Sequence, residues 1–74
     1  MERESVKSSM ISSVGYQAAT KILEIEFNSG AVWQYCDFPK SLWNKFKKCD
    51  SYGRFFRDYI QDSFEEAKVG RKRY

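Results

Sequence analysis

Apolar and polar residues alternate through the first half of the chain, and this period of two is typical of β-strands. Residues 10–16 alternate in this way and predict a first strand. Residues 23–27 read Leu-Glu-Ile-Glu-Phe and predict a second strand with all its apolar side chains on one face. Residues 31–35 predict a third strand, after a loop in which Gly30 can adopt the positive φ that a short hairpin requires.

The length of each loop sets the expected register of the strands. A three-residue loop at 28–30 keeps the apolar side chains of the second and third strands on one face. A four-residue turn before residue 21 extends the same arrangement to the first strand. The expected pairs are Phe27 with Ala31, Ile25 with Trp33, Leu23 with Tyr35, Tyr16 with Lys21, and Val14 with Leu23.

Beyond Pro39 the apolar period changes from two to about 3.6, which indicates helices. Pro39 suits the first turn of a helix, and residues 39–49 place their apolar side chains on one side. Asp50 or Ser51 can cap a second helix, whose apolar stripe continues to Phe64. The predicted fold class is α+β: a three-stranded antiparallel β-meander followed by two C-terminal helices packed on one face.

A chain of 74 residues has room for one domain. We assign residues 1–9 to a flexible N-terminus, 10–64 to the domain, and 65–74 to a basic C-terminal tail. No apolar run is long enough for a membrane span or a signal peptide, so we expect a cytoplasmic protein with no membrane partner. In that compartment Cys36 and Cys49 are expected to be reduced.

The chain contains no histidine, which removes the usual general base and the commonest zinc ligand. The two cysteines do not have the spacing of a metal site. We therefore predict no catalytic residues, no metal, no cofactor and no small-molecule ligand. An enzyme would need a deep polar cleft lined by the few acidic, serine and tyrosine side chains present.

Charge is distributed unevenly. Residues 1–38 hold three Lys/Arg and five Asp/Glu, whereas residues 39–74 hold ten and five. A phosphate backbone could lie across the basic side chains near the junction of the two predicted helices. The alternatives are a solvated surface that keeps a small protein soluble, or a surface for an acidic protein partner. The candidate nucleic-acid-binding residues are Lys45, Lys47, Lys48, Arg54 and Arg57.

Several segments together resemble the KTSC domain, a module found at the C-terminus of some lysyl-tRNA synthetases and as small stand-alone bacterial and phage-type proteins. The segments that carry the resemblance are ISSVGY at 11–16, LEIEF at 23–27, NSGAVWQY at 28–35, FPKSLW at 38–43 and SYGRFF at 51–56. The family's Tyr-x-Tyr motif corresponds here to Trp33-Gln34-Tyr35. Attachment to a synthetase implies a role in binding RNA.

The motif residues Trp33 and Tyr35 have two interpretations. Aromatic pairs on a sheet can stack on the bases of single-stranded RNA. The expected register instead places both rings on the face that the helices cover, which favours the core. The leading hypothesis is thus a non-enzymatic module that binds RNA or another nucleic acid through its basic helical surface. The alternative is a protein-protein interaction module, such as a phage or prophage accessory protein, with no nucleic-acid ligand.

Overall fold

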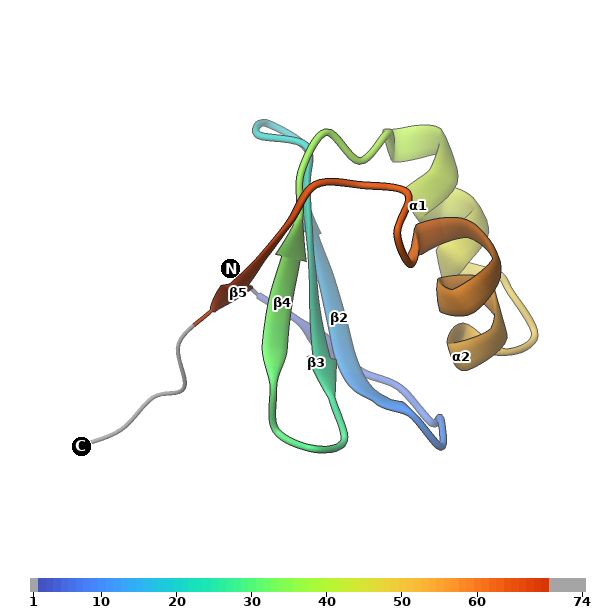
Figure 1. Ribbon diagram of the computed structural model, residues 1–74. Helices are drawn as coiled ribbons and strands as arrows, with labels where there is room; N and C mark the ends of the chain where they lie inside the picture. Colours follow the sequence, from blue (N-terminus) through green and yellow to red (C-terminus); the bar gives the residue numbers. More distant parts are fainter. Residues whose placement is uncertain (1, 70–74) are drawn as a thin grey trace.

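The computed structural model describes residues 2–69 and contains one antiparallel sheet with helices on one face (Figure 1). The α+β class is confirmed, but the sheet has five strands rather than the three we predicted. Their order across the sheet is the same as their order along the chain. The strands are β1 (Glu4–Ser5), β2 (Ile11–Gln17), β3 (Ile22–Phe27), β4 (Val32–Tyr35) and β5 (Glu66–Val69).

The two additional strands come from segments that we had assigned to a flexible terminus and a loose tail. β1 pairs with β2, and β5 pairs with β4, so both lie at the outside of the sheet. A two-residue strand is too short to show alternation, and three of the four residues of β5 are exposed, so its sequence has no apolar face to detect. The part of the predicted tail at 70–74 lies outside the described residues.

The register predicted between β3 and β4 is confirmed. Leu23 pairs with Tyr35 and Ile25 with Trp33. At the hairpin, the Phe27 N–H donates to the carbonyl oxygen of Ala31 at 2.9 Å. Gly30 has a φ of 98°, a conformation that a residue with a side chain rarely adopts.

The register predicted between β2 and β3 is wrong by two residues. Tyr16 pairs with Leu23, and Val14 pairs with Ile25. The four-residue turn lies one position later than expected, at 18–21, and ends at Lys21 with a φ of 57°. A shift of two keeps every side chain on its face, so the hydrophobic pattern cannot distinguish the two registers.

A β-bulge interrupts the alternation that the sequence shows at the start of β2. Ile11 pairs with Phe27 and Ser13 pairs with Glu26, which leaves Ser12 as the extra residue. The bulge lets Ile11 enter the core, where it is fully buried, while Ser13 lies on the outer face of the sheet. Regular alternation over residues 10–16, as we predicted, would place Ile11 on the opposite face from Val14.

Helix α1 (Lys40–Lys47) follows Pro39, as the pattern predicts. The second helix is divided into α2 (Tyr52–Phe55) and the π-helical segment η1 (Phe56–Ile60), and it ends before the predicted Phe64. In η1 the Gln61 N–H donates to the Phe56 carbonyl oxygen, five residues back. This wider turn rotates the following side chains relative to the apolar face of a regular α-helix. Tyr59 therefore faces outward and is 55% exposed.

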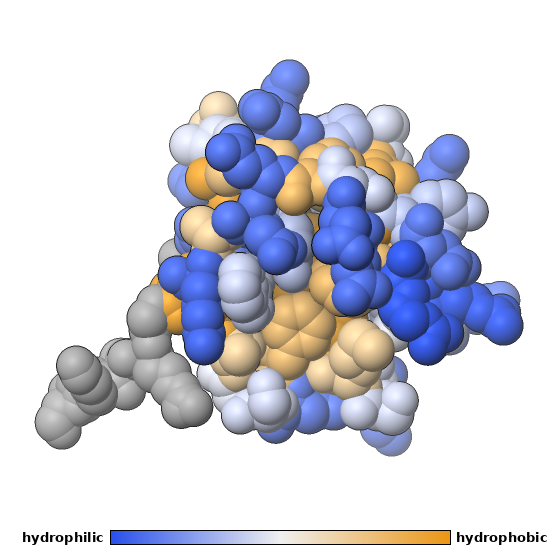
Figure 2. Space-filling view, viewed as in Figure 1, coloured by the Kyte–Doolittle hydropathy of each residue, from blue (hydrophilic) through white to orange (hydrophobic). Residues whose placement is uncertain are grey.

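The core lies between the inner face of the sheet and the helices. On the face shown in Figure 2, hydrophilic side chains surround an apolar area near the middle. Partly buried aromatic residues, including Phe27 and Trp33, pack around the fully buried ones. The buried apolar residues are Ile11, Val14, Leu23, Ile25, Tyr35, Phe38, Phe46, Phe55, Phe56 and Ile60.

Candidate nucleic-acid interface

All five basic residues that we selected from the sequence are exposed, and they lie between the last turn of α1 and η1. Lys45 and Lys47 lie in the last turn of α1, and Lys48 is its C-cap. Arg54 lies in α2 and Arg57 in η1. The segment 40–57 carries six Lys/Arg residues and one Asp, so positive charge is concentrated on the helical part of the molecule. We call these five residues the basic helical surface.

Lys47 is the member of this surface with ionic and aromatic contacts. Its ammonium nitrogen lies 3.3 Å from a carboxylate oxygen of Glu4 and 5.5 Å from the centre of the Trp43 ring. The same indole stacks on Tyr16, with ring centres 5.4 Å apart. Both charged side chains of the pair are largely exposed, so the ion pair contributes little to stability. It does show that the surface accepts a carboxylate.

Arg54 has an acidic neighbourhood. Its side chain lines a shallow pocket of about 220 Å³ together with Asp50, Asp58 and the ring of Tyr59. Its backbone N–H donates to the Ser51 hydroxyl at 3.3 Å, which confirms Ser51 as the cap of α2. One of the free N–H groups at this helix start is therefore already used, and a phosphate would be bound mainly by side chains.

The motif residues Trp33 and Tyr35 lie on the inner side of β4. Tyr35 is 2% exposed and packs edge-on against Phe56, with ring centres 5.9 Å apart. Trp33 is partly buried and packs against the same core. Neither ring lies on the outer face of the sheet, where a single-stranded nucleic acid could stack on it.

Tyr35 should make the protein sensitive to high pH. Burial, with a smaller effect of the Glu66 carboxylate, raises the pKa of the Tyr35 phenol well above its usual value of about 10. The unfolded chain ionises at lower pH than the folded one, so the stability due to Tyr35 is complete below pH about 10. It is lost as the pH rises from there toward the folded pKa. The free energies of unfolding of the parent and of Tyr35→Phe, measured with urea, should be similar at pH 8. Above pH 10 the free energy of unfolding of the parent should fall more steeply than that of the variant. Parallel dependence of the two values on pH would contradict this prediction.

A groove that was not predicted lies beside the N-terminal segment. It has a volume of about 530 Å³ and is lined by residues 2–4 on one side and by residues 14–17 and Trp43 on the other. Arg3, from this segment, contacts Ser13, Glu24 and Glu26 on the outer face of the sheet. Nothing in the residues around Arg3 suggested this role, because its partners are between ten and twenty-three positions away in the chain.

The remaining candidate chemistry is limited. Cys36 and Cys49 are free thiols, and burial, assisted by Asp50, raises the pKa of Cys49. Within residues 2–69, no group of three or more cysteine, aspartate or glutamate side chains is placed to hold a metal ion. In the same range, no helix has the length and apolar character needed to cross a bilayer.

The chain is similar to several known proteins. The model of the KTSC domain family matches residues 7–64. An uncharacterised protein of Stutzerimonas stutzeri is 39% identical over 61 residues, which cover 82% of this chain and 86% of that protein. The lysine–tRNA ligase of Nostoc punctiforme is 32% identical over 59 residues, covering 80% of this chain but 10% of the ligase.

The fold has a solved counterpart. A crystal structure of a KTSC domain protein from Yersinia pestis superimposes with a TM-score of 0.91 at 36% sequence identity. The match covers 93% of this chain and 97% of that one. The segments that carried the resemblance in the sequence all lie within the part matched by the family model. The chain belongs to the KTSC domain family.

Proposed function

We propose that this protein is a non-enzymatic binding module whose basic helical surface contacts the phosphate backbone of RNA. The observation that carries the proposal is the concentration of five exposed cationic side chains between residues 45 and 57, with Asp50 as the only acidic residue in that range. Clustered positive charge on one part of a small domain is the electrostatic footprint expected of a nucleic-acid-binding protein. The similarity to part of a lysine–tRNA ligase supports RNA as the nucleic acid.

The fold separates this surface from the two glutamates of β3. Glu24 and Glu26 lie on the outer face of the sheet, where both contact Arg3, whereas the helices cover the inner face. A polyanion approaching the helices would therefore meet positive charge first. Binding through phosphate contacts requires no stacking platform, which agrees with the inward position of Tyr35 and Trp33.

The proposal is tested by binding of fluorescently labelled RNA, both single-stranded and folded, across a salt series. Four to five phosphate contacts to a single strand should give a log-log slope of about −3, so the affinity should fall roughly 60-fold between 50 and 200 mM salt. A salt-independent affinity, or no saturable binding at low salt, would contradict the proposal.

One observation favours a second candidate, an acidic protein partner. The Lys47 ammonium already pairs with the carboxylate of Glu4, so the surface can take an acidic peptide in place of phosphate. Competition separates the two candidates. If RNA is the ligand, unlabelled RNA should displace the labelled RNA at a far lower concentration than polyglutamate does, when both concentrations are counted as negative charges.

A further inference from the structure

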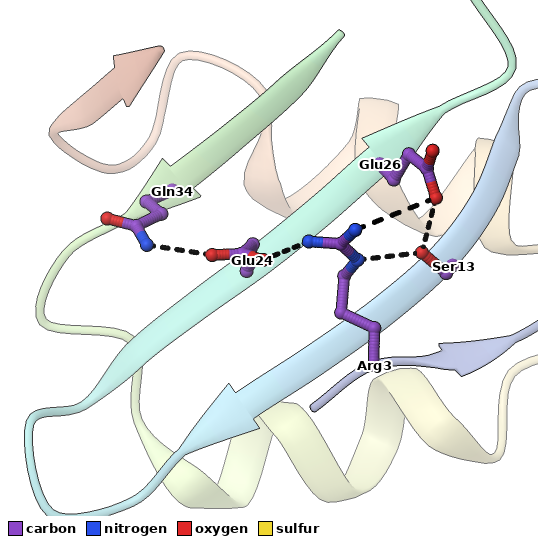
Figure 3. A network of polar contacts seen from close by, with 5 residues as sticks. All are labelled: Arg3, Ser13, Glu24, Glu26 and Gln34. Carbon is purple, nitrogen blue, oxygen red and sulfur yellow. Dashed lines mark hydrogen bonds and ion pairs between the residues drawn. The ribbon is translucent and has the colours of Figure 1, made fainter. Parts of the chain in front are cut away.

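The outer face of the sheet holds an arginine side chain in a set of polar contacts (Figure 3). The Arg3 Nε donates to the Ser13 hydroxyl at 2.9 Å, and its Nη1 pairs with the Glu24 carboxylate. Its Nη2 lies 3.8 Å from an oxygen of Glu26. Three nitrogens of one guanidinium therefore face three different side chains. A lysine ammonium is a point charge and cannot match this planar arrangement.

The side chains that receive Arg3 are themselves held in position. Gln34 donates from Nε2 to the other oxygen of Glu24 at 2.8 Å, and the Ser13 hydroxyl donates to Glu26 at 2.9 Å. These residues project from β2, β3 and β4, so a paired sheet rather than a loop fixes their spacing. Glu24 is only 7% exposed, and a carboxylate so buried needs a cationic partner.

The segment that carries Arg3 fits closely and pairs with β2 over a short length. It crosses β2 at Gly15, where an added Cβ would lie 2.3 Å from the carbonyl oxygen of Glu2. Beyond this crossing, its strand pairing to β2 consists of Glu4 with Val14 and Ser5 with Ser13. The four receiving residues all lie within the family-matched range 7–64, whereas Arg3 lies outside it. The receiving residues therefore belong to the part of the chain that the family model matches, whereas their occupant does not.

We propose that Ser13, Glu24, Glu26 and Gln34 form a guanidinium-binding site that Arg3 fills from within the chain. When the N-terminal segment detaches, the site takes the arginine of an extended segment of another polypeptide. The incoming segment lies beside β2 in the place of β1, so backbone pairing orients it and the guanidinium gives specificity. The N-terminal segment then acts as an internal competitor for the partner.

The test uses the full-length chain with Arg3→Ala, which removes the internal guanidinium and weakens the attachment of the N-terminal segment without changing the four receiving residues. The probe is a synthetic peptide with the sequence of residues 1–8, and a matched peptide carries lysine in place of the arginine. Amide shifts of ¹⁵N-labelled protein report binding at Ser13, Gly15, Glu24 and Gln34. The arginine peptide should bind at least tenfold more tightly than the lysine peptide, and adding Glu24→Gln should remove that preference.

Equal binding of the two peptides, or no saturable shift at millimolar peptide, would overturn the proposal. If Arg3→Ala does not fold, Arg3→Lys keeps a cation beside Glu24 and serves as the receptor in the same titration. In the parent, the Arg3 Nε–H should give a separate, slowly exchanging NMR signal that Glu24→Gln abolishes. An Arg3 side chain that exchanges as fast as the exposed Arg57 would also overturn it.

Discussion

Reversing two charges on the basic helical surface, Lys48→Glu with Arg54→Glu, should weaken RNA binding more than tenfold at about 100 mM salt. The change removes two phosphate contacts and adds two repulsive charges at the junction of α1 and α2. The slope of log affinity against log salt should also become shallower by about 1.4, since each contact to a single strand contributes about 0.7. Both residues are exposed, so the urea midpoint should change little.

The matched control is Lys7→Glu with Lys21→Glu, two exposed positions in the acidic half of the chain. Both double variants lower the formal net charge from +3 to −1, because each substitution replaces a positive charge with a negative one. The control should lose less than about threefold in affinity if position on the surface decides binding. An equal loss in both variants would mean that overall charge, rather than the basic helical surface, governs the interaction.

Phe46→Ala should cost about 3–5 kcal/mol, which is a large part of the stability of so small a domain. Phe46 is fully buried in α1, and its ring lies 5.1 Å from that of Phe55 and 5.3 Å from that of Tyr52. It therefore joins the two helices, and its removal leaves a cavity between them. Denaturant unfolding followed by tryptophan fluorescence and circular dichroism measures the loss.

Tyr59→Ala provides the comparison for Phe46→Ala. The Tyr59 ring lies 4.7 Å from Phe55 but is 55% exposed, so its truncation should cost less than about 1 kcal/mol. A cost below about 1 kcal/mol for Phe46→Ala would show that α1 does not depend on this contact. Similar losses in the two variants would show that exposure in the π-helical turn does not reduce the contribution of Tyr59.

The sequence was most informative where side-chain pattern and loop length agree. The three-residue loop at 28–30 and the matching apolar faces on both sides exclude a slip by one residue between β3 and β4, because that slip would oppose Trp33 to Glu26. The β2–β3 turn carries no such penalty, since a slip by two residues preserves both faces. The left-handed conformation of Lys21 that ends this turn leaves no signal in the residue type.

Other features depend on contacts between distant residues. The bulge at Ser12 adds one residue to a strand, and the π-turn at Phe56–Ile60 adds one residue to a helical turn. Sequence patterns are interpreted with a regular period, so neither irregularity can be predicted from them. The exposed position of the five basic residues follows from their place off the apolar stripes, and the structure agrees with it. Arg3 could not be recognised, because an arginine in a charged terminal segment is ordinarily solvated.

The two edge strands also affect how a shortened fragment of this domain would behave. β1 and β5 are short and carry charged residues at Glu4, Glu66 and Lys68, features that discourage a sheet from pairing with another molecule. A fragment limited to residues 10–64 would lose both strands, and the backbone groups of β2 and β4 that face them would have no partners. Such a fragment would retain most of the core yet be prone to aggregation through strand pairing between copies. Recombinant versions of the domain should therefore include residues 2–69.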